Sequence, residues 1–322
     1  MEGETGKFRI LAMPDIFLDH YMAAGTPDDF AGLILATASA GSRMRVPQHL
    51  SLGGNAYNFA FAAARLGCSV ALLARTSRYL LDLVLRETAG LDFSTEYVTT
   101  GFEPSLTVAL EFRQAIGGRS VNINHPGSLQ EAGPEMIPDE LSGHHFDMVA
   151  VFNLTNNTLG TRLAQRAFSS LGGLKLMDLP DASSPFKDPD GLSDSIGLAD
   201  AISASVEEGI AACSLLGLGE GLTAVESASE LSRLGPVVGL HSQSESLEAR
   251  DGVCTRMAVD TAAYPSTTGA GDFWTAAYAL SLLRLDPPDR RLAFANEQAG
   301  AMLAERKKAM EKWFGAQKSV PR

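Results

Sequence analysis

Short apolar segments alternate with longer segments of helical periodicity along most of the chain. Apolar runs of strand length occupy residues 7–13, 70–74, 147–152, 174–177, 201–204 and 237–240. Helical patterns occupy residues 56–66, 79–88, 159–171 and 270–283, and one more helix follows residue 204 and ends near Leu215. Strands that alternate with helices are typical of a parallel sheet covered by helices on both faces. We therefore predict a single α/β domain over residues 1–322, with three layers in the order α/β/α.

One internal region has a different pattern. Residues 106–112 and 119–124 are rich in β-forming residues with partial alternation, and a Gly-Gly pair at 117–118 separates them. This pattern predicts a β-hairpin inserted into the α/β chain. Residues 23–52 are mixed and indicate loops, short strands or a short helix. We expect some of them to pair with the hairpin.

Composition and charge narrow the classes of partner. The 322 residues are 45% hydrophobic, which is enough apolar surface for a folded core. The net charge of −12 disfavours nucleic acid as a partner, since an acidic surface repels phosphate backbones. No apolar run reaches the roughly 18 residues that span a bilayer. The N-terminal residues are polar and carry no secretion signal. We therefore predict a cytoplasmic protein without a membrane partner.

The strongest chemical signal is STTGAGD at residues 266–272, where the helix over 270–283 begins. Gly269 and Gly271 permit a tight turn and close approach of a ligand to the backbone. The free N–H groups and the dipole at a helix start favour a negatively charged ligand. Asp272 is equally compatible with a charge that stabilises the helix start and with a base that takes a proton from a hydroxyl.

A second glycine-rich helix start is GGNAYN at residues 53–58. Asn58 falls in the first turn of the helix, where its amide can both donate and accept hydrogen bonds. That chemistry suits a polyhydroxyl ligand, although an ordinary helix start with a surface asparagine has the same pattern.

Together the two helix starts resemble the paired signatures of the PfkB carbohydrate kinases, the ribokinase-like family. GGNAYNFAFAAARLG is similar to the N-terminal signature, and STTGAGDFWTAAYALSLL to the C-terminal one, usually D-T-x-G-A-G-D. They occur in the family's order, about 200 residues apart. The resemblance covers residues 8–303. It implies a ribokinase-like fold with a small β-lid, formed here from about residues 20–52 and 103–125. It also implies a homodimer through that lid.

The resemblance further implies transfer of phosphate from ATP, with Mg²⁺, to a hydroxyl of a sugar or nucleoside. Asp272 matches the catalytic base. The anion hole matches Gly269, Ala270 and Gly271. The positions that bind substrate match Asp19, Gly53, Gly54 and Asn58. The positions that bind nucleotide match Thr267, Glu208, His241 and Asn296. Glu208 is also expected to help organise Mg²⁺ through water.

The chain departs from the family pattern at several places. Ser266 stands where the C-terminal signature usually begins with Asp, and Ser205 stands for the Asn of N-x-x-E. The family's nucleotide loop T-x-G-x-x-G corresponds to residues 239–244, where both loop glycines are absent. These departures favour an alternative, a non-catalytic relative that binds a ligand without efficient nucleotide use. A third reading, an NAD-dependent dehydrogenase, requires G-x-G-x-x-G after the first strand, and residues 13–19 lack it.

Two further residues leave both readings open. Asp178 ends a predicted strand at the edge of the sheet where ligands bind, yet it is also typical of a turn aspartate before a proline. His125 follows the hairpin and is compatible with either a substrate contact or a structural hydrogen bond.

Overall fold

The computed structural model describes residues 7–112, 120–154, 156–180, 188–259 and 269–315. Among them, nine strands form one central sheet in the order β15-β14-β13-β12-β11-β10-β1-β4-β6. From β6 to β13 all neighbouring strands are parallel, and β14 and β15 add an antiparallel edge. The strands are β1 Arg9–Met13, β4 Ser69–Leu72, β6 Phe93–Ser94, β10 Met148–Val151, β11 Leu174–Asp178, β12 Ala201–Ser205, β13 Val237–His241, β14 Glu245–Arg250 and β15 Val253–Ala258.

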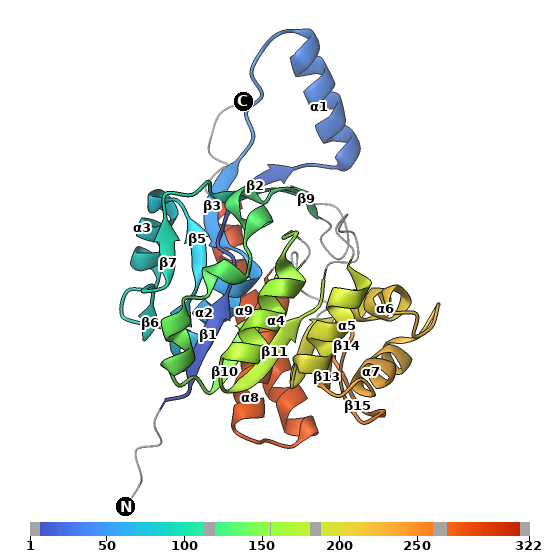
Figure 1. Cartoon of the computed structure of the whole chain (residues 1–322). Coiled ribbons are helices and arrows are strands. Elements are labelled where there is room, and N and C mark those ends of the chain that lie inside the picture. The colour runs from blue at the N-terminus through green and yellow to red at the C-terminus, as the bar shows by residue number, and fades with distance from the viewer. Residues whose placement is uncertain (1–6, 113–119, 155, 181–187, 260–268, 316–322) are drawn as a thin grey trace, which may run out of the picture.

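Helices cover both faces of this sheet (Figure 1). One face carries α2 Asn55–Arg65, α3 Arg78–Glu87, α8 Ala270–Leu283 and α9 Pro288–Gly315. The other face carries α4 Gly160–Ser170, α5 Pro189–Leu198, α6 Val206–Leu215 and α7 Ala224–Ser232. Side chains of β1 alternate between the two cores, with Ile10 in one and Leu11 in the other. The predicted three-layer arrangement is therefore confirmed.

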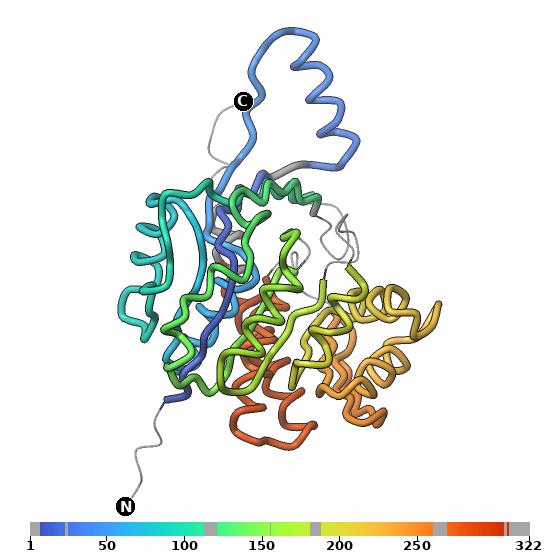
Figure 2. Tube along the Cα trace, in the orientation of Figure 1, coloured from blue at the N-terminus to red at the C-terminus, as the bar shows by residue number. Residues whose placement is uncertain are grey.

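The path of the chain through the central sheet (Figure 2) changes direction at β1. From β1 the chain moves outward to β4 and β6, then returns to β10 on the opposite side of β1. In open α/β sheets, ligands bind outside the carboxyl ends of the strands where the order reverses in this way. The residues that follow β1 and β10 therefore lie where a ligand is expected.

Four strands form a second sheet at that end of the molecule, in the order β3-β2-β8-β9. They are β2 Phe17–Ala24, β3 Gln48–Gly53, β8 Ser105–Phe112 and β9 Ser120–His125. The predicted hairpin corresponds to the antiparallel pair of β8 and β9, and the partners expected from residues 23–52 are β3 and the end of β2. Two short strands, β5 Ala74–Thr76 and β7 Val98–Thr100, pair separately. Three short 3₁₀ helices lie at Gly127–Glu131, Pro134–Met136 and Asp139–Gly143.

Between β2 and β3, helix α1 Pro27–Ser39 extends away from the rest of the molecule (Figure 1). Its start carries strong local signals: the Thr26 side chain accepts a hydrogen bond from the Asp29 N–H, and proline occupies the first turn. Phe30 is its buried residue, and its ring contacts the edge of the Phe112 ring. The mixed pattern of residues 23–52 thus contains a regular helix of 13 residues.

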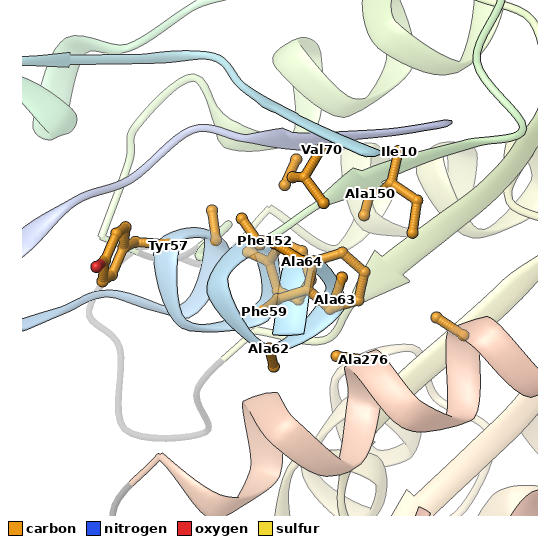
Figure 3. Close-up of a cluster of buried hydrophobic side chains, with 14 of the residues drawn as sticks. Ile10, Tyr57, Phe59, Ala62, Ala63, Ala64, Val70, Ala150, Phe152 and Ala276 are labelled. Carbon is orange, nitrogen blue, oxygen red and sulfur yellow. The ribbon is translucent and has the colours of Figure 1, made fainter. Parts of the chain in front are cut away.

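Helices α2 and α8 pack against each other through small side chains (Figure 3). Ala62 of α2 points toward α8, near Ala276. Phe59 of α2 packs on Phe152, with ring centroids 4.8 Å apart. Alanine costs little side-chain entropy in a helix and lets two helices approach closely. This packing brings the N-terminal turns of α2 and α8 together at the carboxyl edge of the sheet. Among the described residues, no helix is both long enough and apolar enough to cross a membrane.

Candidate functional site

A cavity of about 260 Å³ lies where the carboxyl edge of the central sheet faces the second sheet. Its wall combines aromatic side chains, carboxyl groups and many side-chain amides. The lining residues are Phe17, Asp19, Tyr21, Gly54, Asn55, Asn58, Thr107, Ala109, Asn122, Asn124, Asn153, Asn156, Asp178, Leu179, Glu208, Gly269 and Asp272. The two glycine-rich helix starts, about 200 residues apart in the sequence, therefore meet at one cavity.

The starts of α2 and α8 are joined by a hydrogen bond. The Asn58 Nδ2 donates to Asp272 Oδ2 at 2.8 Å. Gly269, at the N-cap of α8, has a left-handed backbone with φ of 77° and makes no side-chain cap hydrogen bond. Among the described residues, the first N–H groups of α8 next to Asp272 therefore receive no acceptor from an N-cap side chain. The arrangement can hold an anion at the helix start beside a carboxylate.

The Asp272 carboxyl group is buried and lies near other carboxyl groups. Burial raises its pKa well above the ordinary value. The Asn58 hydrogen bond opposes this rise, whereas the charges of Asp15, Glu208 and Asp19 add to it. A carboxyl group with a raised pKa is a stronger base when it is ionised, which suits proton abstraction near neutral pH.

The Asp15 carboxylate forms hydrogen bonds with the start of α2 and with the side chain of Asn153. Asp15 is buried, and it accepts hydrogen bonds from the Ala56 N–H at 3.0 Å and from Asn153 Nδ2 at 3.3 Å. Burial raises the pKa of Asp15 to about 6. Gly54 has φ of 97°, and a Cβ there would lie 2.5 Å from Asp15 Oδ2. The close approach of Asp15 therefore requires glycine at this position.

Glu208 caps the start of α6 and also lines the cavity. Its side chain accepts a hydrogen bond from the Ser205 N–H at 2.8 Å, while the Glu208 N–H donates to Ser205 Oγ at 3.1 Å. This reciprocal capping box fixes the start of α6. Ser205, which replaces the family's asparagine, thus preserves a defined place for Glu208 on the cavity wall.

The cavity can hold Mg²⁺ only if a bound ligand supplies some of the oxygen atoms that coordinate the ion. Among the described residues, no cluster of three or more His, Cys, Asp or Glu side chains has the geometry to hold a metal ion. Mg²⁺ commonly keeps several waters and binds through one or two carboxylates plus substrate phosphates. Glu208 is one carboxylate of this kind on the cavity wall. The oxygen-rich wall therefore fits a hydrated Mg²⁺ that arrives with a phosphate ligand.

The segment matching the nucleotide loop is a tight hairpin in this chain. Strand β13 runs through to His241, and β14 begins at Glu245. In the intervening turn, the Ser242 Oγ accepts hydrogen bonds from the N–H groups of Ser244 and Glu245. These backbone donors are therefore used within the turn. Strand β13 at Val237–His241 agrees with the strand predicted over residues 237–240, and only residues 242–244 of the segment matching the family's loop form the turn.

His241 lies directly against the start of α8. Its ring packs on Trp274 with centroids 4.9 Å apart, and a Cβ on Gly271 would lie 2.8 Å from His241 Cε1. Burial lowers the pKa of His241 to about 4, so its imidazole is neutral at pH 7. A neutral imidazole can donate one hydrogen bond to a phosphate oxygen. His241 therefore stands beside the proposed anion hole, although it does not line the cavity itself.

Other predicted residues are placed less centrally. Asp19 on β2 lines the cavity, accepts a hydrogen bond from the Tyr21 hydroxyl at 3.3 Å and sits against Gly53. Asn296 accepts from Trp274 Nε1 at 2.8 Å and donates to Ser246 Oγ at 3.0 Å, so its amide ties α9 to α8 and β14. Ala270 is the first residue of α8.

Among the described residues, the cavity lining does not include the predicted Gly53, Ala270, Gly271, His241 and Asn296, nor the candidate His125. His125 is exposed and lies 3.2 Å from Glu103. Thr267 and Ser266 lie outside the described residues, so the structure does not place them.

The sequence pattern did not predict most of the side-chain amides on the cavity wall. Asn122 and Asn124 line the cavity from β9, and Asn153 and Asn156 follow β10. Asp178, for which the turn interpretation remained open, lies on the cavity wall and accepts a hydrogen bond from Asn55 Nδ2 at 3.3 Å. The available signal was position, since polar residues that follow parallel strands gather at the ligand-binding edge.

Comparison with solved structures shows the same fold. Adenosine kinase from Sinorhizobium meliloti is 18% identical, with a TM-score of 0.72 and coverage of 93% of this chain and 94% of that one. A Burkholderia thailandensis nucleoside kinase in complex with inosine is 16% identical (TM-score 0.69, coverage 92% and 91%). Arabidopsis thaliana ribokinase complexed with ribose and ATP is 17% identical (TM-score 0.67, coverage 92% and 92%). No curated protein sequence matches this chain.

A sequence model of the family described as pfkB family carbohydrate kinase matches residues 40–312, which is most of the chain. The predicted ribokinase-like fold is therefore confirmed, and the alternative of a non-catalytic relative gains no support. The family match over most of the chain, together with the shared fold, shows that this chain belongs to the pfkB carbohydrate kinase family.

Proposed function

We propose that this protein transfers the γ-phosphoryl group of ATP to a hydroxyl group of a sugar or nucleoside, with Asp272 as the general base. The observation that carries the proposal is the pairing of Asn58 with Asp272 at the start of α8, where the N-cap is Gly269 and the helix start faces the cavity. A carboxylate beside an anion-binding helix start supplies the two requirements of phosphoryl transfer, a positioned nucleophile and charge stabilisation.

In the proposed mechanism, the acceptor hydroxyl binds beside Asp272, and Asp272 takes its proton as the oxygen attacks the γ-phosphorus. Asn58 holds the carboxylate in place through the 2.8 Å hydrogen bond. The N–H groups at Gly269, Ala270 and Gly271 stabilise the charge that develops on the transferring phosphoryl oxygens. The bond to the ADP oxygen breaks, and the proton remains on Asp272 until the product leaves.

We place the nucleotide at the start of α8. The solved ribokinase that contains both ribose and ATP has this fold, which supports ATP as the phosphate donor. His241, Thr267 and Asn296 are the proposed nucleotide contacts on this side. Mg²⁺ would neutralise charge on the ATP phosphates, and Glu208 is the residue that would reach it through water. A kinase that uses ATP works where ATP is available, which supports the predicted cytoplasmic location.

We place the acceptor between the two sheets. Asp19 and Asn58 line the cavity there, and Gly53 and Gly54 let the backbone approach closely. The bound ligands of the similar structures, ribose and inosine, support a sugar or a nucleoside as the acceptor class. The second sheet would act as the lid over this acceptor.

We also propose that two copies associate through the lid and α1. Leu33, Ile34 and Leu35 of α1 are 44%, 44% and 68% exposed, an unusual run for a helix. The exposed acidic residues Asp28 and Asp29 lie at the start of α1, and exposed Arg43 and Arg45 follow its end. A second copy packed antiparallel across a two-fold axis would place each acidic end beside a basic one. This charge complementarity supports a second copy as the partner.

A nucleotide-consumption assay tests the proposed activity. Sugars and nucleosides are supplied with ATP and Mg²⁺, and the enzyme is compared with Asp272→Asn and with Asp289→Asn at the start of α9. We expect turnover with at least one acceptor, a loss of about 10²- to 10⁴-fold for Asp272→Asn, and little change for Asp289→Asn. Full activity of Asp272→Asn would contradict the role of Asp272. A melting-temperature rise with ATP in that variant would show that it still folds and binds nucleotide.

A further inference from the structure

Among the described residues, the charged side chains on the cavity wall are all acidic. Four carboxyl groups line it, those of Asp19, Asp178, Glu208 and Asp272. Six asparagine side chains complete most of the polar surface. Among the described lining residues there is no Lys, Arg or His. Asparagine amides can donate to and accept from hydroxyl groups without adding charge. The wall is therefore built to bind hydroxyl groups in a negative environment.

These carboxyl groups interact with one another. Burial raises the pKa of Asp178 well above its ordinary value, and the charges of Glu208 and Asp272 add to the rise. Asp19, Asp15 and Glu208 likewise raise the pKa of Asp272. Burial is the larger cause of both shifts, but the contributions of the neighbouring carboxylates mean that each of these groups disfavours a further negative charge beside it. A phosphate or carboxylate on the acceptor would be disfavoured in the same way.

Asp178 has a defined hydrogen-bond partner on the cavity wall. It is the last residue of β11 and is 9% exposed. Asn55 Nδ2, from the first residue of α2, donates to Asp178 Oδ2 at 3.3 Å. Both side chains line the cavity. The Asp178 carboxyl group is thus oriented to accept a further hydrogen bond from an O–H or N–H group of a ligand.

The anion-binding start of α8 is a different part of the same cavity. Gly269 and Asp272 line it there, and the helix start, with glycine at its N-cap, favours negative charge. The nucleotide phosphates therefore have a binding position of their own at the start of α8. The start of α2 beside Asp178 and Asn55 differs, because its Ala56 N–H already donates to Asp15 at 3.0 Å, and this region offers the Asp178 carboxyl group to a ligand instead.

We propose that the phosphoryl acceptor carries no negative charge and that the Asp178–Asn55 pair selects it by accepting a hydroxyl or amine hydrogen bond. This inference rests on the proposed function and narrows its substrate class: neutral sugars, nucleosides and amino sugars are accepted, whereas sugar acids and sugar phosphates are rejected. Asp178 is then a specificity-determining residue that contacts the acceptor.

Binding titrations with matched pairs test the charge rule. The pairs are galactose with galacturonate, glucose with gluconate, and inosine with inosine 5′-monophosphate, each titrated calorimetrically in the presence of a non-hydrolysable ATP analogue. We expect the uncharged member of a pair that binds to bind about tenfold or more tightly than its anionic partner. Tighter binding of an anionic member would overturn the inference. Failure of every uncharged member to bind at millimolar concentration would also count against it.

A second experiment separates this inference from the proposed function. A small-molecule extract is divided by anion exchange, and each fraction is incubated with enzyme and ATP labelled on the γ-phosphate. We expect labelled product from the unretained fraction. Label only in the retained, anionic fraction would overturn the inference but keep the kinase. Without label from either fraction, the proposed function fails, and the binding titrations alone decide the charge rule.

The variant Asp178→Asn tests the residue itself. The substitution keeps an oxygen that can accept from Asn55 and removes the charge. We expect the preference for the uncharged member to fall about tenfold, while affinity for the ATP analogue stays within about twofold. The control Asp139→Asn removes an exposed carboxyl group, 93% accessible, and is expected to change neither value. An unchanged preference in Asp178→Asn, together with unchanged melting, would exclude Asp178 as the selecting group.

Discussion

Asn58 donates a 2.8 Å hydrogen bond to Asp272, and the two residues come from the first turns of helices that are more than 200 residues apart. The bond places an amide between the start of α2 and the proposed base. It also opposes the rise in the pKa of Asp272 caused by burial and by nearby carboxyl groups. Asn58 therefore sets both the position and the acidity of the group that would take the acceptor proton.

The first prediction concerns the pH dependence of the rate. A base must be deprotonated, so kcat/KM should rise with pH through the pKa of Asp272. Because that pKa is raised, the acid limb should lie above the value of about 4 expected for an exposed aspartate. Asn58→Ala removes the interaction that lowers the pKa and should move the acid limb to higher pH. The pH profile of kcat/KM, measured with saturating ATP, checks both statements.

The matched control for this experiment is Asn156→Ala. Asn156 also lines the cavity, but its amide donates to Asn153 and not to Asp272. It should leave the position of the acid limb unchanged. A limb that stays in place in Asn58→Ala would show that Asp272 is not the group titrating in the rate.

The second prediction concerns His241, which ends β13 at the hairpin where the family's loop glycines are absent. His241 packs on Trp274 and lies against Gly271 beside the anion hole. Its pKa of about 4 makes the ring neutral at working pH, so it would contact phosphate as a hydrogen-bond donor. Loss of one such bond costs about 1 kcal/mol, or roughly fivefold in affinity. His241→Ala should therefore raise KM for ATP about fivefold and leave acceptor KM nearly unchanged.

Two companion variants make the His241 result decisive. His241→Gln keeps a donor of similar size and should recover part of the ATP affinity. His144→Gln changes an exposed histidine that contacts Tyr97 and should have no effect on KM for ATP. Equal values of KM for ATP in His241→Ala and the unmodified enzyme would remove His241 from the nucleotide site.

Local sequence signals predicted α2 and α8 nearly to the residue. Both helices have strong apolar periodicity and a glycine at their start, and these signals require no distant partner. The approach of Asn58 to Asp272 depends on packing between α2 and α8, so the residues alone could not give it. It entered the prediction through the family resemblance, which placed both signatures at one site.

Strand β14 shows the opposite case. Its sequence ESLEAR carries three charged residues in six positions, so its pattern did not predict a buried strand. Glu248 is 3% exposed in the structure because Arg291 of α9 neutralises it. Arg291 lies 43 residues away along the chain, so the residues near β14 do not indicate this ion pair. Helix α1 was also left undecided, because its apolar residues are exposed and do not match a core-facing stripe.

The third prediction uses this buried ion pair. Arg291 Nε donates to Glu248 Oε2 at 2.6 Å, and the Tyr278 hydroxyl donates to the same oxygen at 3.0 Å. Arg291→Met would leave a buried carboxylate without its counter-ion, at a cost of about 3–5 kcal/mol in the free energy of unfolding. Urea unfolding measures this loss. The double variant with Glu248→Gln removes the stranded charge while keeping an acceptor for Tyr278, and it should recover much of the stability.

The control for the ion pair is an exposed one. Arg166 contacts Asp139 at 2.9 Å, with side chains 44% and 93% accessible. Arg166→Met should change the free energy of unfolding by no more than about 1 kcal/mol, since solvent screens the pair. If Arg291→Met is as mild as Arg166→Met, burial of the Glu248 charge does not govern the stability of this edge of the sheet.

The last prediction concerns association through α1. The exposed side chains of Leu33, Ile34 and Leu35 would be covered if a second copy packed on this helix. Light scattering after size exclusion should then give twice the chain mass of 34.1 kDa at micromolar concentration. Leu35→Glu puts a charge into the proposed contact and should shift the protein to a single-chain mass. Its melting temperature should fall by no more than a few degrees, because the Leu35 side chain is 68% exposed within its own chain. Val253→Glu, at a residue 74% exposed on β15, is the matched control and should leave the mass unchanged. A single-chain mass for the unmodified protein would rule out the dimer, and a double mass that survives Leu35→Glu would move the contact away from α1.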